Sequence, residues 1–290
     1  MMNEAVQNSP FKQHEDFYID QDFAMLNGNL EIFRFLLSNQ TPFRIEDLRM
    51  GIILKGELHA IINLQERHLK TGMIACITPG AIVQPIQISD DFYIRGMAVF
   101  TDNVLARAGL RLPAMMNGQI RDFQLTPDEQ TTQIIRKLFE ALWSVVSHGK
   151  NHLSHEVLGC MVGAIINEYA HAFALYSESK RQKKNRNQEI FDRFMALVNQ
   201  IGGRERQLSY FANRLFLSQR YLGTVIRQVS GMTAKEWLDR ATISEAKILL
   251  KHSELQVSQI ADQLKFPNSS FFCKYFKRLT GMTPNEYKKE

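Results

Sequence analysis

The hydrophobic pattern of the last 85 residues contains the same unit twice. Apolar positions between Leu208 and Trp237 return between Val257 and Tyr287 at a shift of 49 to 50 residues. Within each copy they recur at intervals of three, four and seven, which is typical of one helix face. The shift grows by one residue in the middle of the unit. Each copy therefore predicts two short helices separated by a turn.

The second helix of each copy has a candidate N-cap. Ser218 stands at this position in the first copy, and Asn268 with Ser269 stands there in the second. Such side chains accept hydrogen bonds from the free backbone N–H groups of the first helical turn. A short helix, a tight turn and a longer helix form a helix-turn-helix, whose second helix fits the DNA major groove. Two copies predict two groove contacts.

The polar positions of these second helices are the candidate DNA-binding residues. They are Ser218, Gln219, Arg220, Thr224 and Arg227 in the first copy, and Asn268, Ser269, Ser270, Cys273, Lys274 and Lys277 in the second. Gln and Arg near the helix start can bond base edges bidentately, whereas Arg227 and Lys277 suit phosphate. The alternative is an ordinary solvated helix face. The duplication favours DNA binding.

The segment from Thr233 to Lys251 predicts one continuous helix between the copies. It lacks internal Pro and Gly, and Thr233 with Glu236 has capping-box spacing. At 1.5 Å per residue its length is roughly 27 to 30 Å, close to the spacing of about 34 Å between successive major grooves. The helix could therefore set the spacing of two groove contacts, while also packing the two halves together.

Residues 188 to 289 resemble the DNA-binding domain of AraC/XylS-type transcriptional regulators. The resemblance rests on the duplicated units, the joining helix and a closing signature of Phe276, Lys277, Arg278, Gly281, Thr283, Pro284, Tyr287 and Lys288. It implies sequence-specific binding to double-stranded DNA, and activation through contact with RNA polymerase. By position it assigns base-reading roles to Arg220, Thr224, Ser269, Ser270 and Lys274. Repression is the open alternative to activation.

The chain departs from the pattern of this family in its turns and its joining helix. Phe216 and Lys265 stand where the family often or usually has Gly. If these positions need positive φ, each costs about 1 kcal/mol, and the turns are then expected to bend differently. Thr242 replaces a usual Arg, and Gly223 brings no side chain to the groove face. The bases that are read therefore cannot be copied from a relative.

Charge divides the chain into two parts of opposite sign. Residues 180–290 contain 21 Lys and Arg against 10 Asp and Glu, whereas residues 1–179 contain 14 against 20. A basic C-terminal part is expected of a domain that binds phosphates. Between the parts lies a polar stretch with five basic residues among seven, at 180–186. We therefore predict a sensing and dimerisation domain at 1–177, a basic linker at 178–187 and a DNA-binding domain at 188–290.

Short apolar runs punctuated by turn residues predict an antiparallel β-barrel or sandwich in the first part. The predicted strands are Ile32–Leu37, Leu48–Leu54, Leu58–Leu64, Met73–Ile77, Ala81–Ile88 and Phe92–Phe100. Thr78-Pro79-Gly80 is similar to the turn of the cupin-type barrel that receives the effector in AraC/XylS-like proteins. The expected fold class is α+β, with a cupin-like barrel, two following helices and an all-helical C-terminal domain.

A cupin-like barrel raises the alternative of a small-molecule-binding enzyme with a degenerate helical appendage. Metal-dependent cupins need several His residues and a Glu around one ion. Here His59 and His68 are nine residues apart, and the sequence pairs them with no third ligand. Neither a Ser/His/Asp order nor a phosphate-binding glycine loop appears. We expect no metal, no cofactor and no catalysis.

An effector pocket without catalysis stays open. Arg34, Arg44, Tyr93 and Arg95 lie in or beside predicted strands and could meet an anionic effector if they point inward. An Arg at a sheet edge more often extends into water. The ligand-binding residues and the effector are therefore unknown.

Two helices are predicted after the strands. Thr126-Pro127-Asp128-Glu129 combines a cap, Pro at the first helical position and acidic residues, and opens a helix to about His148. The second helix runs from about His152 to Ser177. It has an apolar stripe interrupted by Glu168 and consisting of Leu158, Met161, Ile165, Ala172 and Leu175. The stripe predicts either a homodimer seam or packing within the chain.

The remaining features bound the location of the protein. Cys76, Cys160 and Cys273 are far apart, so they predict neither a disulfide framework nor a zinc site. The start of the chain, with Glu4, Glu15 and Asp16, does not resemble a signal peptide. Since no run reaches the length of a membrane span, we expect a cytoplasmic protein.

Overall fold

The computed structural model of the 290-residue chain describes residues 17–28, 41–101, 103–106, 108–111, 122–148, 154–181 and 185–289. They form two compact units. Glu66–Gln182 belongs to the first unit, and Lys183–Glu290 belongs to the second. The predicted strand Ile32–Leu37, its Arg34 and the acidic residues Glu4, Glu15 and Asp16 lie outside the described residues.

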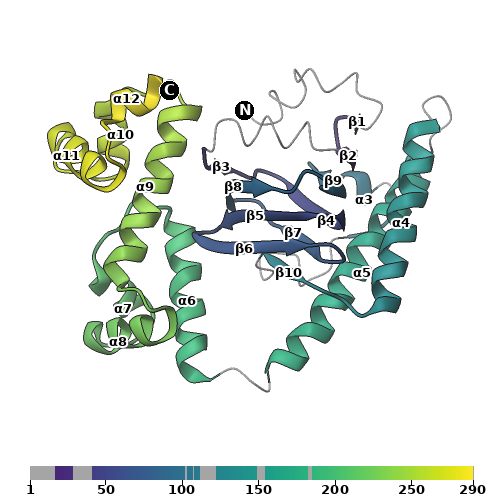
Figure 1. The fold of residues 1–290 in the computed structure, drawn as a ribbon, viewed down its shortest axis with the longest axis horizontal. Helices are drawn as coiled ribbons and strands as arrows, with labels where there is room; N and C mark the ends of the chain where they lie inside the picture. Colours follow the sequence, from purple (N-terminus) through teal and green to yellow (C-terminus); the bar gives the residue numbers. More distant parts are fainter. Residues whose placement is uncertain are drawn as a thin grey trace. The chain divides into compact units, whose positions relative to one another are not determined.

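The first unit contains two β-sheets. The six-stranded sheet has the order β1 (Phe17–Ile19), β2 (Phe23–Gly28), β9 (Tyr93–Val99), β4 (Leu48–Lys55), β7 (Ile74–Ile77) and β10 (Phe123–Leu125). Each neighbouring pair in it is antiparallel. The four-stranded sheet has the order β3 (Phe43–Arg44), β8 (Ile82–Ile88), β5 (Glu57–Ile62) and β6 (Gln65–Lys70). The predicted sheet-rich, antiparallel first part is confirmed (Figure 1).

The apolar runs located five of the strands, β4, β5, β7, β8 and β9, to within about two residues. The predicted strand Leu58–Leu64 is too long, because Asn63 and Leu64 have φ of 49° and 68° and form the turn to β6. The pattern missed β6 because five of its six residues are polar and only Leu69 is buried. It also missed β2, which precedes the punctuated region.

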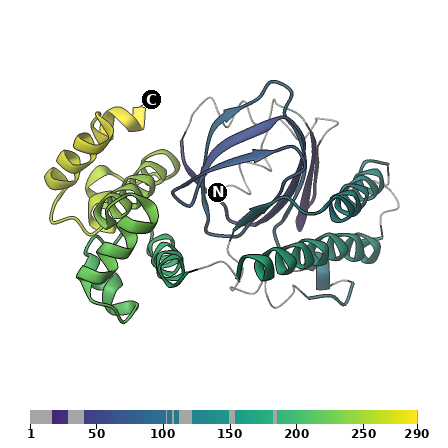
Figure 2. The same cartoon turned by 60° about the horizontal axis from the view of Figure 1, so that its bottom comes forward.

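The helices α4 (Glu129–His148) and α5 (His155–Arg181) pack on one face of the six-stranded sheet (Figure 2). Alternate residues of β2, β4, β7 and β9 point toward them, which places a hydrophobic core between sheet and helices. The largest side chains of this core include Phe23, Met25, Ile52, Ile74, Phe139 and Tyr169. The short helix α3 (Asn103–Ala106) also contacts α5.

The dimer-seam interpretation of the α5 stripe is wrong for most of its residues. Leu158, Ile165 and Ala172 are at most 4% exposed, because they face the core of their own unit. Leu175 of the stripe is 47% exposed, and Val157, at 49%, and Tyr176 are the other exposed large apolar residues in the described part of α5.

The segment His155–Ser179 of α5 is long and apolar enough to cross a membrane, judged by length and composition alone. Half of its most apolar window is buried inside the structure. The buried part is the face that packs into the core, as in a core helix of a globular protein.

The start of α4 differs from the prediction by two residues. The Asp128 carboxylate accepts hydrogen bonds from the backbone N–H and the hydroxyl of Thr131, at 2.9 and 2.8 Å. These bonds favour the charged form and lower the pKa of Asp128. Asp128 is therefore the cap, and neither Thr126 as cap nor Pro127 as first helical residue is correct.

Residues 185–289, which make up most of the second unit, form helices joined by turns and loops. The helices are α6 (Arg186–Ile201), α7 (Leu208–Arg214), α8 (Gln219–Ser230), α9 (Ala234–His252), α10 (Val257–Gln263), α11 (Ser269–Thr280) and α12 (Pro284–Lys289). Since α5 reaches Arg181 and α6 begins at Arg186, both ends of the predicted linker 178–187 are helical.

The joining helix α9 belongs to two hydrophobic cores. Its first half contributes Trp237 and Leu238 to a core with α6, α7 and α8. Its second half contributes Ala246 and Leu250 to a core with α10, α11 and α12. The two recognition helices α8 and α11 therefore pack near opposite ends of α9 (Figure 1).

Candidate DNA interface

The first helix-turn-helix unit is formed by α7 and α8. Ser218 is extended and accepts a hydrogen bond from the backbone N–H of Tyr221 at 3.2 Å, which confirms it as the N-cap of α8. Gly231, with φ of 73°, ends the helix. Leu222 and Ile226 are fully buried on the inner face. The opposite face of α8 is left to solvent.

The second unit, formed by α10 and α11, repeats this arrangement. Asn268 accepts from the backbone N–H of Phe271 at 3.0 Å, so Asn268 is the cap and Ser269 is the first helical residue. Gly281, with φ of 86°, ends α11. Phe272 and Phe276 are fully buried. The two units are thus built on the same local rules.

Nine of the eleven candidate DNA-binding residues are exposed, and the other two, Ser269 and Cys273, are partly buried. The hydroxyl of Thr224 donates to the carbonyl of Arg220 at 3.0 Å, so it can accept from a base as it stands but must rotate before it can donate to one. The caps Ser218 and Asn268 already use one side-chain oxygen each. Exposure makes these residues available to DNA, and their individual roles stay a prediction.

Three exposed aromatic residues were missed as members of this surface. Tyr221 and Phe271, which the repeat pattern counts among the apolar core positions, are 39% and 62% exposed on the first turns of α8 and α11. Phe216 is 91% exposed in the turn before α8. The helical repeat places Tyr221 and Phe271 on the apolar face of each helix. It does not show whether a position lies at the buried centre of that face or at its exposed edge.

Both turns adopt the left-handed backbone that glycine favours. Phe216 and Lys265 have φ of 57° and 56°. In each turn the next residue donates its backbone N–H back into the preceding helix, from Leu217 to Ala212 at 2.9 Å and from Phe266 to Ala261 at 2.8 Å. The positive φ on which the expectation of differently bent turns depends is confirmed, and the two turns share one geometry despite its cost. That they bend differently from turns with glycine stays a prediction.

Polar contacts tie the two helix-turn-helix units to each other. Arg206, in the loop between α6 and α7, donates to the carbonyls of Leu264 and Lys265 at 2.6 and 2.8 Å. The hydroxyl of Tyr275 on α11 donates to Asp239 on α9 at 2.6 Å. Burial, reinforced by Asp239, raises the pKa of Tyr275 above its usual range, so its proton stays in place. These contacts fix the spacing of α8 and α11 more firmly than α9 alone could.

The family departure at Thr242 has a structural reason. Its side chain is fully buried, and its hydroxyl lies within hydrogen-bonding distance of the carbonyls of Leu238 and Gly203, at 2.9 and 3.1 Å. A Cβ on Gly203 would lie 2.6 Å from the Thr242 Cα. The α6–α7 loop therefore passes directly over α9, where a long charged side chain would have no room.

Capping boxes follow both recognition helices. Glu236 accepts from the hydroxyl and backbone N–H of Thr233, at 2.7 and 2.6 Å, and Glu286 accepts from the backbone N–H of Thr283 at 2.6 Å. These hydrogen bonds lower the pKa of both carboxyl groups. Arg227 and Lys277 lower them further by charge, so each candidate phosphate ligand lies near a cap carboxylate.

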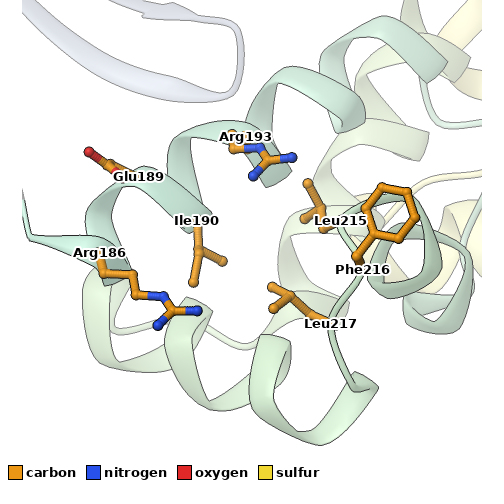
Figure 3. Close-up of a pocket in the computed structure, with 7 residues that line it drawn as sticks. All are labelled: Arg186, Glu189, Ile190, Arg193, Leu215, Phe216 and Leu217. Atoms are coloured by element: carbon orange, nitrogen blue, oxygen red, sulfur yellow. The ribbon is translucent and has the colours of Figure 1, made fainter.

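A pocket of about 240 Å³ opens beside the turn of the first helix-turn-helix unit. Figure 3 shows Ile190 of α6 facing Leu215 and Leu217 of the turn, with Arg186 and Arg193 toward the two ends of the pocket. Its wall is apolar and its rim mostly cationic, and the exposed ring of Phe216 lies at one side.

The candidate effector residues of the first unit engage protein groups. Arg44 donates to the carbonyl of Gly80 at 2.8 Å. Tyr93 and Arg95 both donate to the side-chain oxygen of Asn27, at 3.2 and 2.8 Å. Asn27 was not predicted, because it lies on the strand β2 that the pattern missed. The contacts hold Tyr93 and Arg95 together.

All three cysteines are free. Cys76 is buried, and burial together with Asp122 raises the pKa of its thiol to about 12, which makes it unreactive. Cys160 is exposed on α5, and Cys273 is partly exposed on α11.

Residues 211–290 match the family described as a helix-turn-helix domain. The uncharacterised HTH-type transcriptional regulator YijO of Escherichia coli K12 is 23% identical over 186 residues, which cover 64% of this chain and 56% of YijO. The HTH-type transcriptional activator RhaR of Cronobacter sakazakii is 32% identical over 102 residues, 35% of this chain and 36% of that protein. In RhaR of Salmonella schwarzengrund the match is 28% over 252 residues, 86% of this chain and 79% of that protein. The chain thus aligns with about half or less of the length of the first two relatives.

Two solved structures resemble the chain. ToxT from Vibrio cholerae O395 is 16% identical, with a TM-score of 0.37, over 94% of this chain and 95% of that chain. The DNA-binding domain of AdpA in complex with a target DNA is 21% identical, with a TM-score of 0.32, over 34% of this chain and 89% of that chain.

Proposed function

We propose that this chain, which belongs to the AraC-type helix-turn-helix family of DNA-binding transcriptional regulators, recognises a specific DNA sequence by placing α8 and α11 in successive major grooves. The observation that carries the proposal is the duplicated unit. Two helices with matching caps, turns and polar faces lie near opposite ends of one joining helix. A single exposed helix would not need this repetition.

The length of α9 supports contact with two grooves. Its 19 residues span about 28 Å at 1.5 Å per residue. Successive major grooves on one side of B-form DNA lie about 34 Å apart. The contacts of Arg206 and Tyr275 keep the two helix-turn-helix units from rotating independently, so both recognition helices meet the duplex together.

We assign the residues of each recognition helix by their distance from its N-terminus. The residues expected to contact base edges are Gln219, Arg220 and Thr224 on α8, and Ser269, Ser270, Cys273 and Lys274 on α11. Arg227 and Lys277, in the last turns, are to contact phosphates. The caps Ser218 and Asn268 place the helix N-termini, whose partial positive charge favours a phosphate nearby.

Selection of bound sequences from a random DNA pool tests the proposal. The full chain should enrich one motif whose two halves are about one helical turn apart. Arg220→Ala and Lys274→Ala should each lower affinity for that motif by about 1 to 3 kcal/mol and relax preference in one half only. Lys289→Ala, an exposed basic residue off the recognition helices, is the control. Enrichment of no motif would overturn the proposal.

We further propose that the chain activates transcription in the cytoplasm by contact with RNA polymerase. The support is that the RhaR relatives are described as transcriptional activators. Since the relatives are named as regulators, they also favour this function over a cupin-like enzyme. Transcription in vitro from the selected motif should rise when the chain is added, and a fall would identify a repressor.

The first unit is proposed to bind a small-molecule effector and to form a homodimer. A homodimer would double the length of the DNA site. Val157 and Leu175 are apolar and exposed on α5, and they offer a surface for a second copy. Val157→Glu with Leu175→Glu should convert a dimer into a monomer in light-scattering measurements, whereas Glu168→Gln on the same helix should not.

A further inference from the structure

The outer face of the β5–β6 hairpin brings together two imidazoles and a carboxylate. The two-residue turn at Asn63 and Leu64 joins the strands. The rings of His59 and His68 stack with centroids 4.1 Å apart and planes 12° from parallel. One carboxylate oxygen of Glu66 lies 3.7 Å from Nε2 of His59. Residues on two strands thereby form one cluster.

The donor atoms of His59, Glu66 and His68 all lie within 4.8 Å of one another. Two ligands at about 2.0 to 2.2 Å from a tetrahedral Zn²⁺ are about 3.4 Å apart, so the separation of 3.7 Å is already close to that value. Glu66 and His68 are exposed, so Glu66 can move the remaining distance and His68 can tilt out of its stack on His59 to aim its lone pair at the same ion, without disturbing a packed core. The strand backbone holds all three residues on one face.

His59 gives a second, independent indication. Its Nε2 atom is buried and has no hydrogen-bond partner among the described residues. A buried polar atom normally has a partner, and leaving it without one costs free energy. A metal ion at this position would use the lone pair of that nitrogen. The alternative is a direct contact between His59 and Glu66 without an ion, in which His68 only stacks on the His59 ring.

We propose that His59, Glu66 and His68 bind one divalent transition-metal ion, with Zn²⁺ the best fit, and leave a coordination position open to water. Two imidazoles and one carboxylate suit this class of ion, whereas Mg²⁺ and Ca²⁺ prefer oxygen ligands alone. The ion would join β5 to β6 on the face opposite the buried Ala60 and Leu69. The expectation of no metal was based on a missing third ligand, and Glu66 supplies it only once the hairpin register is known.

Calorimetric titration of the metal-free full chain with Zn²⁺ at pH 7.5 tests this site. We expect one ion per chain with a Kd of roughly micromolar or below. The double variant His59→Gln, His68→Gln should weaken binding by about 100-fold or more, and Glu66→Gln should weaken it by at least about 10-fold. His171→Gln, an exposed histidine on α5, should bind as the unchanged chain does. Binding that persists in the double variant, or that is absent from the unchanged chain, would overturn the proposal.

Two further readouts separate the ligands from other effects. Zn²⁺ should raise the Tm of the unchanged chain but not that of the double variant, and equal Tm values in chelator should show that the variant folds. Co²⁺ in place of Zn²⁺ should give visible d–d bands without a thiolate charge-transfer band. A thiolate band would locate the ion at Cys160 or Cys273 and overturn the assignment.

Discussion

The guanidinium group of Arg206 lies over the ring of Phe266, 4.0 Å from its centroid. Arg206 precedes α7, in the first helix-turn-helix unit, and Phe266 closes the turn of the second. The same guanidinium donates to the carbonyls of Leu264 and Lys265, where the hydrogen bonds of α10 end. One side chain therefore satisfies the end of a helix and stacks on the aromatic ring that follows it.

Arg206→Ala should lower the free energy of unfolding of the second unit by about 1 to 3 kcal/mol, because it removes two charged hydrogen bonds and a cation–π contact. At temperatures well below the Tm, where the variant is folded, its DNA affinity should also be lower, since the spacing of α8 and α11 becomes looser. Thermal unfolding and gel-shift titrations measure the two effects. Arg204→Ala, an exposed residue of the same loop, is the control. If both variants behave alike, Arg206 does not join the units.

Glycine at the two left-handed turn positions should stabilise the protein. Phe216→Gly and Lys265→Gly each remove a cost of about 1 kcal/mol for positive φ on a residue with a Cβ, for a net gain of up to about 0.5 kcal/mol after the extra entropy of glycine in the unfolded chain. The Phe216 ring is 91% exposed, so little packing is lost.

Matched glycine substitutions in the preceding helices give the opposite sign. Asn213→Gly and Gln263→Gly, at exposed positions of α7 and α10, should destabilise by about 0.5 to 1 kcal/mol. Chemical denaturation of the four variants compares them directly. A loss of stability in Phe216→Gly would mean that the ring makes a contact worth more than the backbone strain.

The sequence predicted the second unit better than the first, for a physical reason. Ser218, Asn268 and the Thr233–Glu236 pair act through residues three positions away, so short-range spacing was enough to identify them. The bridge of Arg206 spans 58 residues and follows no periodic pattern. It depends on how two helical units pack together.

In the first unit the missing information is strand register. Glu66 and His68 lie on a strand with a single buried residue, so hydrophobic alternation gave no signal for it. The cluster with His59 appears only when the two strands are paired across their turn. The same holds for Asn27, which meets Tyr93 and Arg95 across 66 and 68 residues of sequence.

The capping carboxylates predict how stability depends on pH. Hydrogen bonds from Thr233 and Thr283 lower the pKa of Glu236 and Glu286 in the folded protein. Their contribution to the free energy of unfolding is complete at a pH above the ordinary glutamate pKa of 4.5, and it is lost as the pH falls through the lowered pKa values. Glu236→Gln with Glu286→Gln keeps the oxygen acceptors but should flatten the dependence of Tm on pH below about 5. Glu254→Gln, an exposed acid outside the caps, should leave the profile unchanged.

The assignment of Arg227 and Lys277 to phosphate predicts a change in salt dependence rather than in sequence preference. Each cation bound to a phosphate releases about one counterion, so Arg227→Ala or Lys277→Ala should reduce the slope of log K against log salt by about 1. The preferred motif should stay the same, because phosphate contacts carry no base information. Arg220→Ala is the internal comparison, since the loss of a base contact should change the motif in one half-site. If Arg227→Ala changes the motif and leaves the salt slope intact, then Arg227 reads bases, and α8 enters the groove further along its length than the position of its cap suggests.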